Sequence, residues 1–440
     1  MALIVYRGHK GLRKVNSDRF KDKRSPQNRI IKDGHIDEST VFTFVDFIPS
    51  FCKKVQDRTV YHSFSSLVNL ANEWLHRNPS WEVISCETVP QYHHSVVSEI
   101  EYSADVYTLR LWVRRSETVN YCTDDVIFWY KDFVPNRRAD QSFEQLEDLI
   151  EGINEEIQGG RINGKILQIE TIKIGANDDW NYHIDATYIS DGKTTRDMNR
   201  FTNFLIGIRV FFQIGSWLED EIVLVDFVPE FDLTESQSFR TKEKFSQLID
   251  KSAKWLIANQ DLNFCNAQAV DIRVRETENQ NLETRRTWWV KQDIDKMVRF
   301  LRIYCTKPNE MGRLMAASNS DLSLFTHNPE LILSSIAFDQ KTFHQDIIDW
   351  YKNFQSSQIG EKLIKRRIAT IETLIIPPFV HHDVGLSFQH SVDQTLIGSP
   401  MQGRMKYLFV AIRIYFQETP ERSESAEEST EVHSDLDEKN

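Results

Sequence analysis

The chain has 440 residues, of which 40% are hydrophobic and 11% aromatic, and it carries a formal net charge of −12. With only 16 Gly and 12 Pro, it is not a collagen-like or low-complexity chain. The sequence contains no run of about 18 apolar residues that would predict a membrane span. Its five cysteines form no CxxC pair, which favours a reducing intracellular location, cytoplasmic or nuclear. The length predicts more than one domain.

The first segment, residues 1–38, is basic, with ten Lys or Arg against five Asp or Glu. We expect a disordered arm that carries a nuclear-import signal or contacts RNA, a membrane surface or a partner protein. A solvated leader without a dedicated partner would have the same composition. The candidate contact residues are Arg13, Lys14, Lys21, Lys23 and Arg24, and the adjacent Ser25 is a phosphorylation candidate.

A short pattern of an aliphatic residue, an arginine, a second aliphatic residue and an aromatic recurs four times along the chain. The arginines, which lie 99, 93 and 111 residues apart, are Arg110, Arg209, Arg302 and Arg413. Such runs are typical of β-strands. Upstream of the first three copies, a strand-like segment ends in Asp-Phe-Ile/Val-Pro, and proline ends a β-ladder because it has no N–H to donate. The fourth copy, 331–338, lacks this proline.

A helix is expected between these two patterns in every copy, because apolar residues there recur at spacings of three and four. The apolar stripes run from Phe64 to Trp74, Phe143 to Ile153, Phe245 to Trp255 and Phe343 to Phe354. Another strand follows each helix. In three copies it contains Glu, Thr and an aliphatic residue, beginning at Glu87, Glu170 and Glu372.

Each copy therefore has the order strand, helix, strand, variable loop, strand. We predict an α+β fold of four tandem, diverged β-α-β-β repeats, each with a mostly antiparallel sheet and one packed helix, between disordered ends. The predicted repeats are 39–118, 119–216, 217–308 and 329–417, with a linker at 309–328. Because one such unit buries little core, neighbouring units are expected to pair.

The four repeated arginines are candidates for contact with an anion or a partner, because each points to the opposite face of its strand from its aliphatic neighbours. The alternative is a solvent-exposed arginine that pairs with the repeated glutamate of an adjacent strand, which would contribute roughly 0.2–1 kcal/mol. The aromatic residue that ends each pattern could stack on a nucleobase, but the flanking positions are not basic enough to favour this.

Two histidine pairs, His93-His94 and His381-His382, follow the Glu-Thr strand in the first and fourth copies. Imidazole is a common metal ligand, so the pairs could form a site if these two copies met in space. However, adjacent residues of an extended chain point to opposite sides, and no Cys or carboxylate has zinc-motif spacing. We predict no metal and no other cofactor. GxSxG and HExxH strings are also absent, so we predict no catalytic residue.

The last segment, 418–440, is rich in Ser, Glu and Asp, and we expect it to be a disordered acidic tail. Its phosphorylation candidates are Ser423, Ser425 and Ser429, although a purely solubilising tail would have the same composition. The body between the two ends is also acidic, which disfavours a broad nucleic-acid-binding surface.

These features favour a non-catalytic intracellular scaffold that binds other proteins through sheet edges or variable loops. One alternative is RNA binding through the basic arm. Another is a small-ligand carrier or an enzyme with a pocket between repeats. The oligomeric state is left open.

Overall fold

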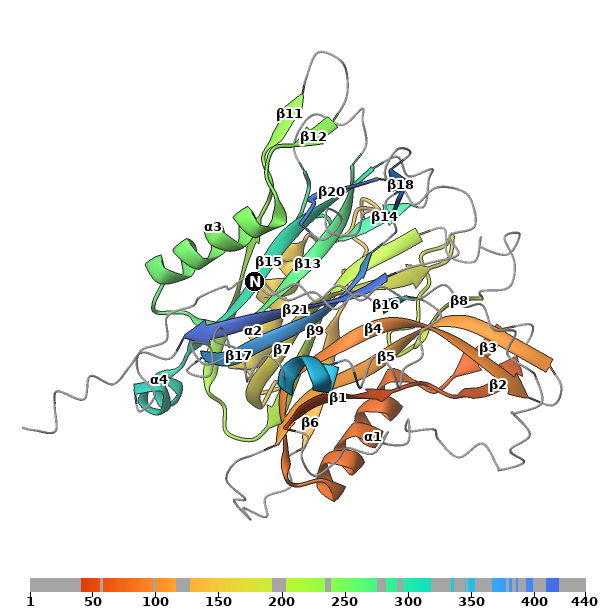
Figure 1. Cartoon of the computed structure of the whole chain (residues 1–440), viewed down its shortest axis with the longest axis horizontal. Helices are drawn as coiled ribbons and strands as arrows, with labels where there is room; N and C mark the ends of the chain where they lie inside the picture. Colours follow the sequence, from red (N-terminus) through yellow and green to blue (C-terminus); the bar gives the residue numbers. More distant parts are fainter. Residues whose placement is uncertain are drawn as a thin grey trace, which may run out of the picture.

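The structure is a computed structural model that describes residues 41–55, 58–97, 100–115, 127–191, 203–233, 239–274, 282–290, 296–317, 334–335, 345, 347–352, 366–376, 380–381, 385–386, 393–398 and 409–418. The fold is α+β, with mostly antiparallel sheets and few helices (Figure 1). The predicted arm and nearly all of the predicted tail lie outside the described residues.

Four antiparallel sheets share one strand order, in which the last strand along the chain lies between the other two. The first sheet has the order β1 (Phe42–Phe47), β5 (Ile100–Arg115), β4 (Trp81–Val97). The second has the order β6 (Phe128–Phe133), β9 (Asn203–Ile214), β7 (Gly164–Ala176). The third has the order β10 (Glu219–Phe227), β15 (Lys296–Pro308), β13 (Asn263–Val274). The fourth has the order β16 (Ser334–Ser335), β21 (Phe409–Glu418), β17 (Arg366–Ile376).

Three helices follow the predicted apolar stripes: α1 (Phe64–Arg77), α2 (Leu146–Gln158) and α3 (Phe245–Ala258). Residues 347–352, within the fourth stripe, are also helical, and a further helix, α4, spans Glu310–Ala317. The stripe positions of α1, Phe64, Leu67, Ala71 and Trp74, are all buried, which is the outcome expected of an amphipathic helix. Helix α4 lies within the predicted linker 309–328, so the start of that segment is regular structure.

Short strands extend the sheets and link neighbouring ones. Three of them come from the variable loop of one sheet and pair with the last strand of the preceding sheet: β8 (Tyr188–Asp191) with β5, β14 (Trp288–Val290) with β9, and β20 (Leu396–Gly398) with β15. The others form hairpins: β2 (Phe51–Val55) with β3 (Arg58–Tyr61), β11 (Phe231–Leu233) with β12 (Phe239–Thr241), and β18 (Val380–His381) with β19 (Gly385–Leu386).

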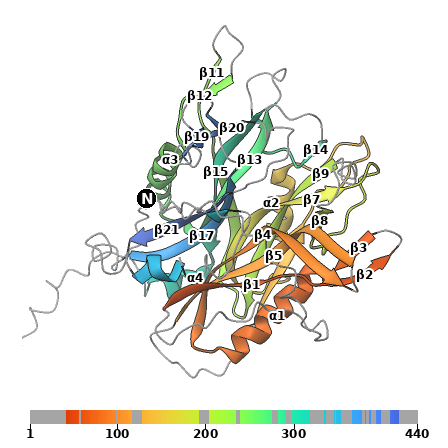
Figure 2. The same cartoon turned by 45° about the vertical axis from the view of Figure 1, so that its right-hand side comes forward.

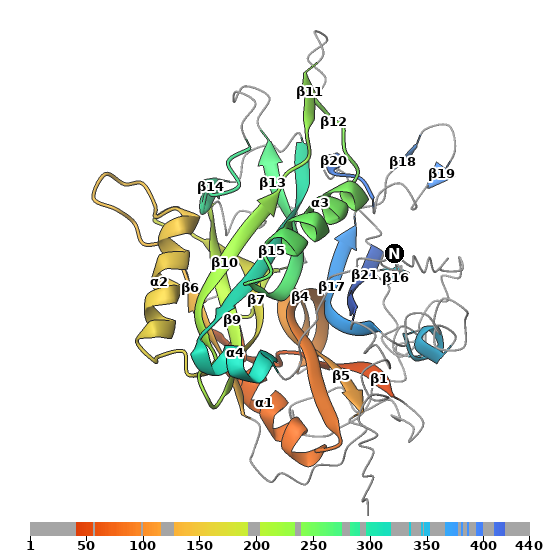
Figure 3. The ribbon, with the colours of Figure 1, turned by 90° about the vertical axis from the view of Figure 1, so that its left-hand side faces the viewer.

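Strands β4, β7, β13 and β17 each lie at one edge of their own sheet and face the middle of the molecule, so we call them the inner strands. They contact one another in cyclic order: β4 with β7, β7 with β13, β13 with β17, and β17 with β4 (Figure 2). The sheets therefore form a closed ring. Strands β11, β12, β14, β18, β19 and β20 gather at one end of the ring, which we name the loop end, and α4 lies toward the opposite end (Figure 3).

Helices α1, α2 and α3 and the helical residues 347–352 each pack into a core that spans two neighbouring sheets. Helix α1 packs against β5 and also against Phe128 and Phe211 of the second sheet. The cores of α2 and α3 reach the next sheets in the same way, through Tyr304 and Tyr415. Trp350 closes the ring by packing with Trp112 of the first sheet. The repeated strand aromatics are thus buried, so the suggestion that they stack on nucleobases is wrong.

Candidate functional site

The repeated arginines lie at the centre of the polar contacts between sheets, and the first three are buried and held by aspartates. Each aspartate belongs to the Asp-Phe-Ile/Val-Pro string and lies opposite its arginine in the strand register. Both oxygens of each carboxylate accept a hydrogen bond from the guanidinium, at 2.7 to 2.9 Å, in the pairs Arg110–Asp46, Arg209–Asp132 and Arg302–Asp226. The alternative in which these three arginines are solvent-exposed and pair with the repeated glutamates is therefore wrong.

The repeated glutamates make contacts across the junctions between sheets. Glu170 of the second sheet accepts a hydrogen bond from the backbone N–H of Thr88 of the first sheet at 3.0 Å, and another from the Thr88 hydroxyl. The contact to the backbone N–H recurs at every junction: Gln268 with Thr171, Glu372 with Ala269, and Glu87 with Thr373. The last pair joins the first sheet to the fourth and completes the ring. Because the inner strands are edge strands, these side chains satisfy N–H groups that would otherwise lack a ladder partner.

The arginines and glutamates are joined through the threonines. Arg209 donates to the Thr88 hydroxyl at 2.9 Å, Arg302 to that of Thr171 at 2.9 Å, and Arg110 to that of Thr373 at 3.1 Å. At these three junctions the threonine hydroxyl of one sheet therefore binds the arginine of its neighbour, and at two of them it also binds the neighbour's glutamate. Such buried networks are stable only when nearly every polar group has a partner.

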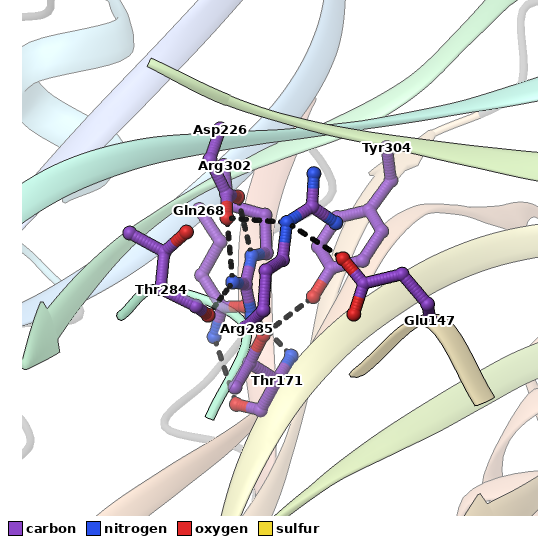
Figure 4. Close-up of polar contacts among 8 residues, drawn as sticks. All are labelled: Glu147, Thr171, Asp226, Gln268, Thr284, Arg285, Arg302 and Tyr304. Carbon is purple, nitrogen blue, oxygen red and sulfur yellow. Dashed lines mark hydrogen bonds and ion pairs between the residues drawn. The ribbon is translucent and has the colours of Figure 1, made fainter. Parts of the chain in front are cut away.

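Figure 4 shows the junction between the second and third sheets. Arg302, held by Asp226, also donates to the backbone carbonyl of Thr284 at 2.9 Å. The hydroxyls of Tyr304 and Thr171 are 2.6 Å apart. Arg285 adds two longer ion pairs, to Glu147 at 3.3 Å and to Asp226 at 3.8 Å.

The fourth arginine has a different partner. Arg413, which is fully buried, donates to Glu372 of the adjacent strand at 2.6 Å, and the Tyr415 hydroxyl donates to the same carboxylate oxygen at 2.8 Å. Its guanidinium lies over the ring of Phe245, 3.8 Å from the centroid, as that of Arg209 lies over Phe64 at 3.6 Å. Here the expected pairing of arginine with the repeated glutamate is correct, although the pair is buried.

A second polar layer lies two residues before the glutamates, and sequence reasoning missed it. Ser85, Gln168, Asn266 and Thr370 are all buried, and each directly follows a β-bulge in its strand. The hydroxyls of Ser85 and Thr370 donate to Gln168 at 3.2 and 3.3 Å. The Asn266 amide binds the backbone N–H and carbonyl of Ile169 at 2.9 and 2.7 Å. The sequence signal that could have predicted this layer is a polar residue two positions before the glutamate, or before Gln268, in all four strands.

The network holds more carboxylates than arginines, and this affects their protonation. Burial raises the pKa of Glu170 to about 7, although the charge of Arg209 and the hydrogen bonds from Thr88 lower it. Burial also raises the pKa of Glu87, against opposing contributions from Arg110 and Thr373. Part of the negative charge in the ring is therefore neutralised by bound protons near neutral pH.

The variable loops also cap helices of the preceding sheet, through a pattern that sequence reasoning missed. Asp185 accepts hydrogen bonds from the backbone N–H and the hydroxyl of Ser65 in α1, at 2.8 and 2.6 Å, and Asp393 binds Ser246 of α3 in the same way. Burial would raise the pKa of Asp185, but hydrogen bonds from Ser65 and Tyr130 outweigh it and lower this pKa.

The signal for these caps was a threonine two residues after each capping position. Thr187 donates to the backbone carbonyl of His62 at 2.7 Å, and Thr395 donates to that of Glu243 at 2.6 Å. Thr287 donates to the carbonyl of Glu144, but there Arg285 stands where the other two loops have Asp.

The structure does not bring the two histidine pairs into one strand or sheet. His93 and His94 lie in β4, whereas His381 lies in β18, which pairs with β19; His382 is outside the described residues. Among the described residues, no group of three His, Cys, Asp or Glu could hold a metal. No helix in this part of the chain is long and apolar enough to cross a membrane.

The predicted residues of the two ends also lie outside the described part. They are Arg13, Lys14, Lys21, Lys23, Arg24 and Ser25 in the arm, and Ser423, Ser425 and Ser429 in the tail. Comparison of the chain with protein-family models, curated proteins and solved structures found no match. Function must therefore be inferred from the geometry of the chain itself.

Proposed function

We propose that the protein is a non-catalytic intracellular scaffold, in the cytoplasm or nucleus, built from four tandem β-α-β-β repeats that bind partner proteins at the loop end. The observation that carries this proposal is that the repeated charged and aromatic side chains bind one another across the junctions. Residues used in this way stabilise the ring and are not available for chemistry on a substrate.

Three features support the repeat interpretation. The four sheets share a strand order, and each inner strand has a bulge at the equivalent place. Each repeated arginine lies in the central strand of its sheet. Duplication of one unit would produce all three features, with later divergence of single positions such as Ala269, where the other sheets have threonine.

The loop end has the character of a protein-binding surface. Phe204 and Trp289 stack with their ring centroids 4.4 Å apart, and the Lys173 ammonium lies 4.1 Å from the Trp289 centroid. Tyr182 is 40% exposed. Trp180 has φ of 65°, a conformation that a bulky residue rarely adopts without a reason. Aromatic side chains flanked by cations are frequent anchors at protein interfaces.

Affinity purification of the tagged full-length chain from its native cells, with and without nuclease, tests the proposal. We expect partner proteins to co-purify in amounts close to that of the tagged chain and to be recovered equally after nuclease treatment. The Trp289→Ala variant should no longer recover them. Trp217→Ala is the matched control, because this exposed Trp precedes β10 near α4, away from the loop end. Recovery that collapses with nuclease, or with deletion of residues 1–38, would instead favour RNA binding. Retention of the same partners by the Trp289 variant would exclude the loop end.

A further inference from the structure

Glu219, at the start of β10, is a buried carboxylate with an incomplete set of partners. It is 7% exposed, and its Oε2 atom has no hydrogen-bond partner in the described part of the chain. It stands at a bulge and lies opposite Pro308, which has no N–H to offer. An ionised carboxylate in such a position is costly unless a cation or several donors compensate it.

The residues just before Glu219 anchor helix α4. The backbone N–H of Asn309, which precedes α4, donates to the carbonyl of Leu218 at 2.9 Å, and its side chain donates to the carbonyl of Trp217 at 3.0 Å. Gly312 of α4 lies so close that a Cβ atom there would be 2.2 Å from the Leu218 carbonyl oxygen. Any displacement of residues 217–219 would therefore break the hydrogen bonds and the close contact that hold α4 in place.

We propose that Glu219 is a proton-controlled latch that keeps α4 docked while it is protonated and releases α4 when it ionises. Ionisation leaves a buried charge that Lys165 and the N–H groups of Ile166, Leu218 and Glu219 compensate only in part. The segment relieves this charge by moving the carboxylate to water, which removes the carbonyls that bind Asn309. Release would free α4.

The groups around the carboxylate set the pH at which this occurs. Burial raises the pKa of Glu219 from its ordinary value of 4.5 to about 7, whereas the N–H of Ile166 and the charge of Lys165 on β7 lower it. The thiol of Cys265 on β13 also interacts with the Glu219 carboxylate. Burial raises the pKa of this thiol, so it carries no charge near neutral pH. Docking is therefore strongest below about pH 4.5, weakens as the pH rises to about 7, and levels off above that value.

Amide hydrogen exchange of residues 310–317, corrected for the intrinsic rate, measures docking in the full chain. We expect protection to fall about tenfold between about pH 6 and about pH 8, because only the docked state retains the raised pKa. Glu219→Gln should hold its protection over this range, whereas the neighbouring Asp220→Asn should respond like the wild type. Gly312→Ala supplies the undocked reference, with low protection at every pH.

Lys165→Gln gives an independent test at an exposed position. Loss of this cation should move the transition to higher pH, because its charge lowers the pKa of Glu219. The proposal is overturned if wild-type protection does not change with pH, if the Glu219 variant keeps the wild-type response, or if the transition is unmoved in the Lys165 variant.

Discussion

Replacing Glu170 by Gln should make the protein more stable at alkaline pH than the wild type, which is the opposite of what loss of an ionic partner for Arg209 would suggest. Amide and carboxyl groups are nearly isosteric, and Gln268 already occupies the equivalent place in the third sheet, bound to both backbone groups of Thr171. Asp132 continues to pair with Arg209 in the variant. The substitution thus removes a titrating group and keeps the hydrogen bond from the Thr88 N–H, while the new amide NH2 group donates to the Thr88 hydroxyl oxygen.

The size of the effect follows from the difference in proton affinity between the folded and unfolded states. The pKa of Glu170 is about 7 in the folded chain against an ordinary 4.5, and each tenfold difference in proton affinity corresponds to about 1.4 kcal/mol. Since the folded state binds this proton more tightly than the unfolded state, the contribution of Glu170 to stability is largest below about pH 4.5 and falls until about pH 7. The wild type should therefore lose about 3 kcal/mol relative to the variant across that window.

Denaturant unfolding of both proteins at a series of pH values measures this difference. The quantity of interest is the free energy of unfolding of the variant minus that of the wild type, which should rise with pH and then level off. Glu151→Gln, the same chemical change on an exposed face of α2, should give a flat difference. If the Glu170 difference is also flat, or falls with pH, the assignment of a retained proton to the ring is refuted.

Three further substitutions test the packing of the ring by the same unfolding measurement. Arg209→Ala leaves Asp132 buried without its cation, and we expect a loss of about 3–5 kcal/mol; a loss below about 1 kcal/mol would contradict a buried pair. Asp185→Ala removes the acceptor for the backbone N–H and hydroxyl of Ser65 in the first turn of α1, while the N-cap Ser63 remains, and should cost about 1–2 kcal/mol of unfolding free energy. Gly164→Ala should prevent stable folding, because its φ is 150° and a Cβ would be 1.8 Å from a backbone oxygen, whereas Gly152→Ala, with open space in α2, should stabilise by up to about 1 kcal/mol.

The sequence identified the elements of the ring well because each has a local signal. Alternating apolar residues predicted the strands, and spacings of three and four predicted α1, α2 and α3. The position of α4 was missed because the segment after Pro308 lacks a long apolar stripe. A helix of eight residues has little intrinsic signal, and this one is seated by contacts of Asn309 and Gly312 with Leu218.

The partners of the arginines were harder to predict because Arg110 has an acid on each side. It lies in the central strand, opposite Asp46 in β1 and opposite Glu87 in β4, so both register positions offered an ion pair. Sequence alone favoured the glutamate. The aspartate binds because both its oxygens reach the guanidinium directly across the strand, while the longer glutamate extends past the edge of its sheet to Thr373. Which acid binds depends on a neighbouring sheet that no local pattern describes.

The junction between the third and fourth sheets explains why the network tolerates a missing member. Ala269 stands where the other sheets have threonine, so no hydroxyl is present there to receive a hydrogen bond from Arg413. Arg413 donates instead to Glu372, whose other oxygen still accepts the N–H of Ala269. The backbone contact is thus common to all four junctions, whereas the arginine contact varies. We infer that the main structural role of these side chains is to supply an acceptor for an edge N–H of each inner strand. The arginines support this contact through a threonine hydroxyl at three junctions and by binding the carboxylate directly at the fourth.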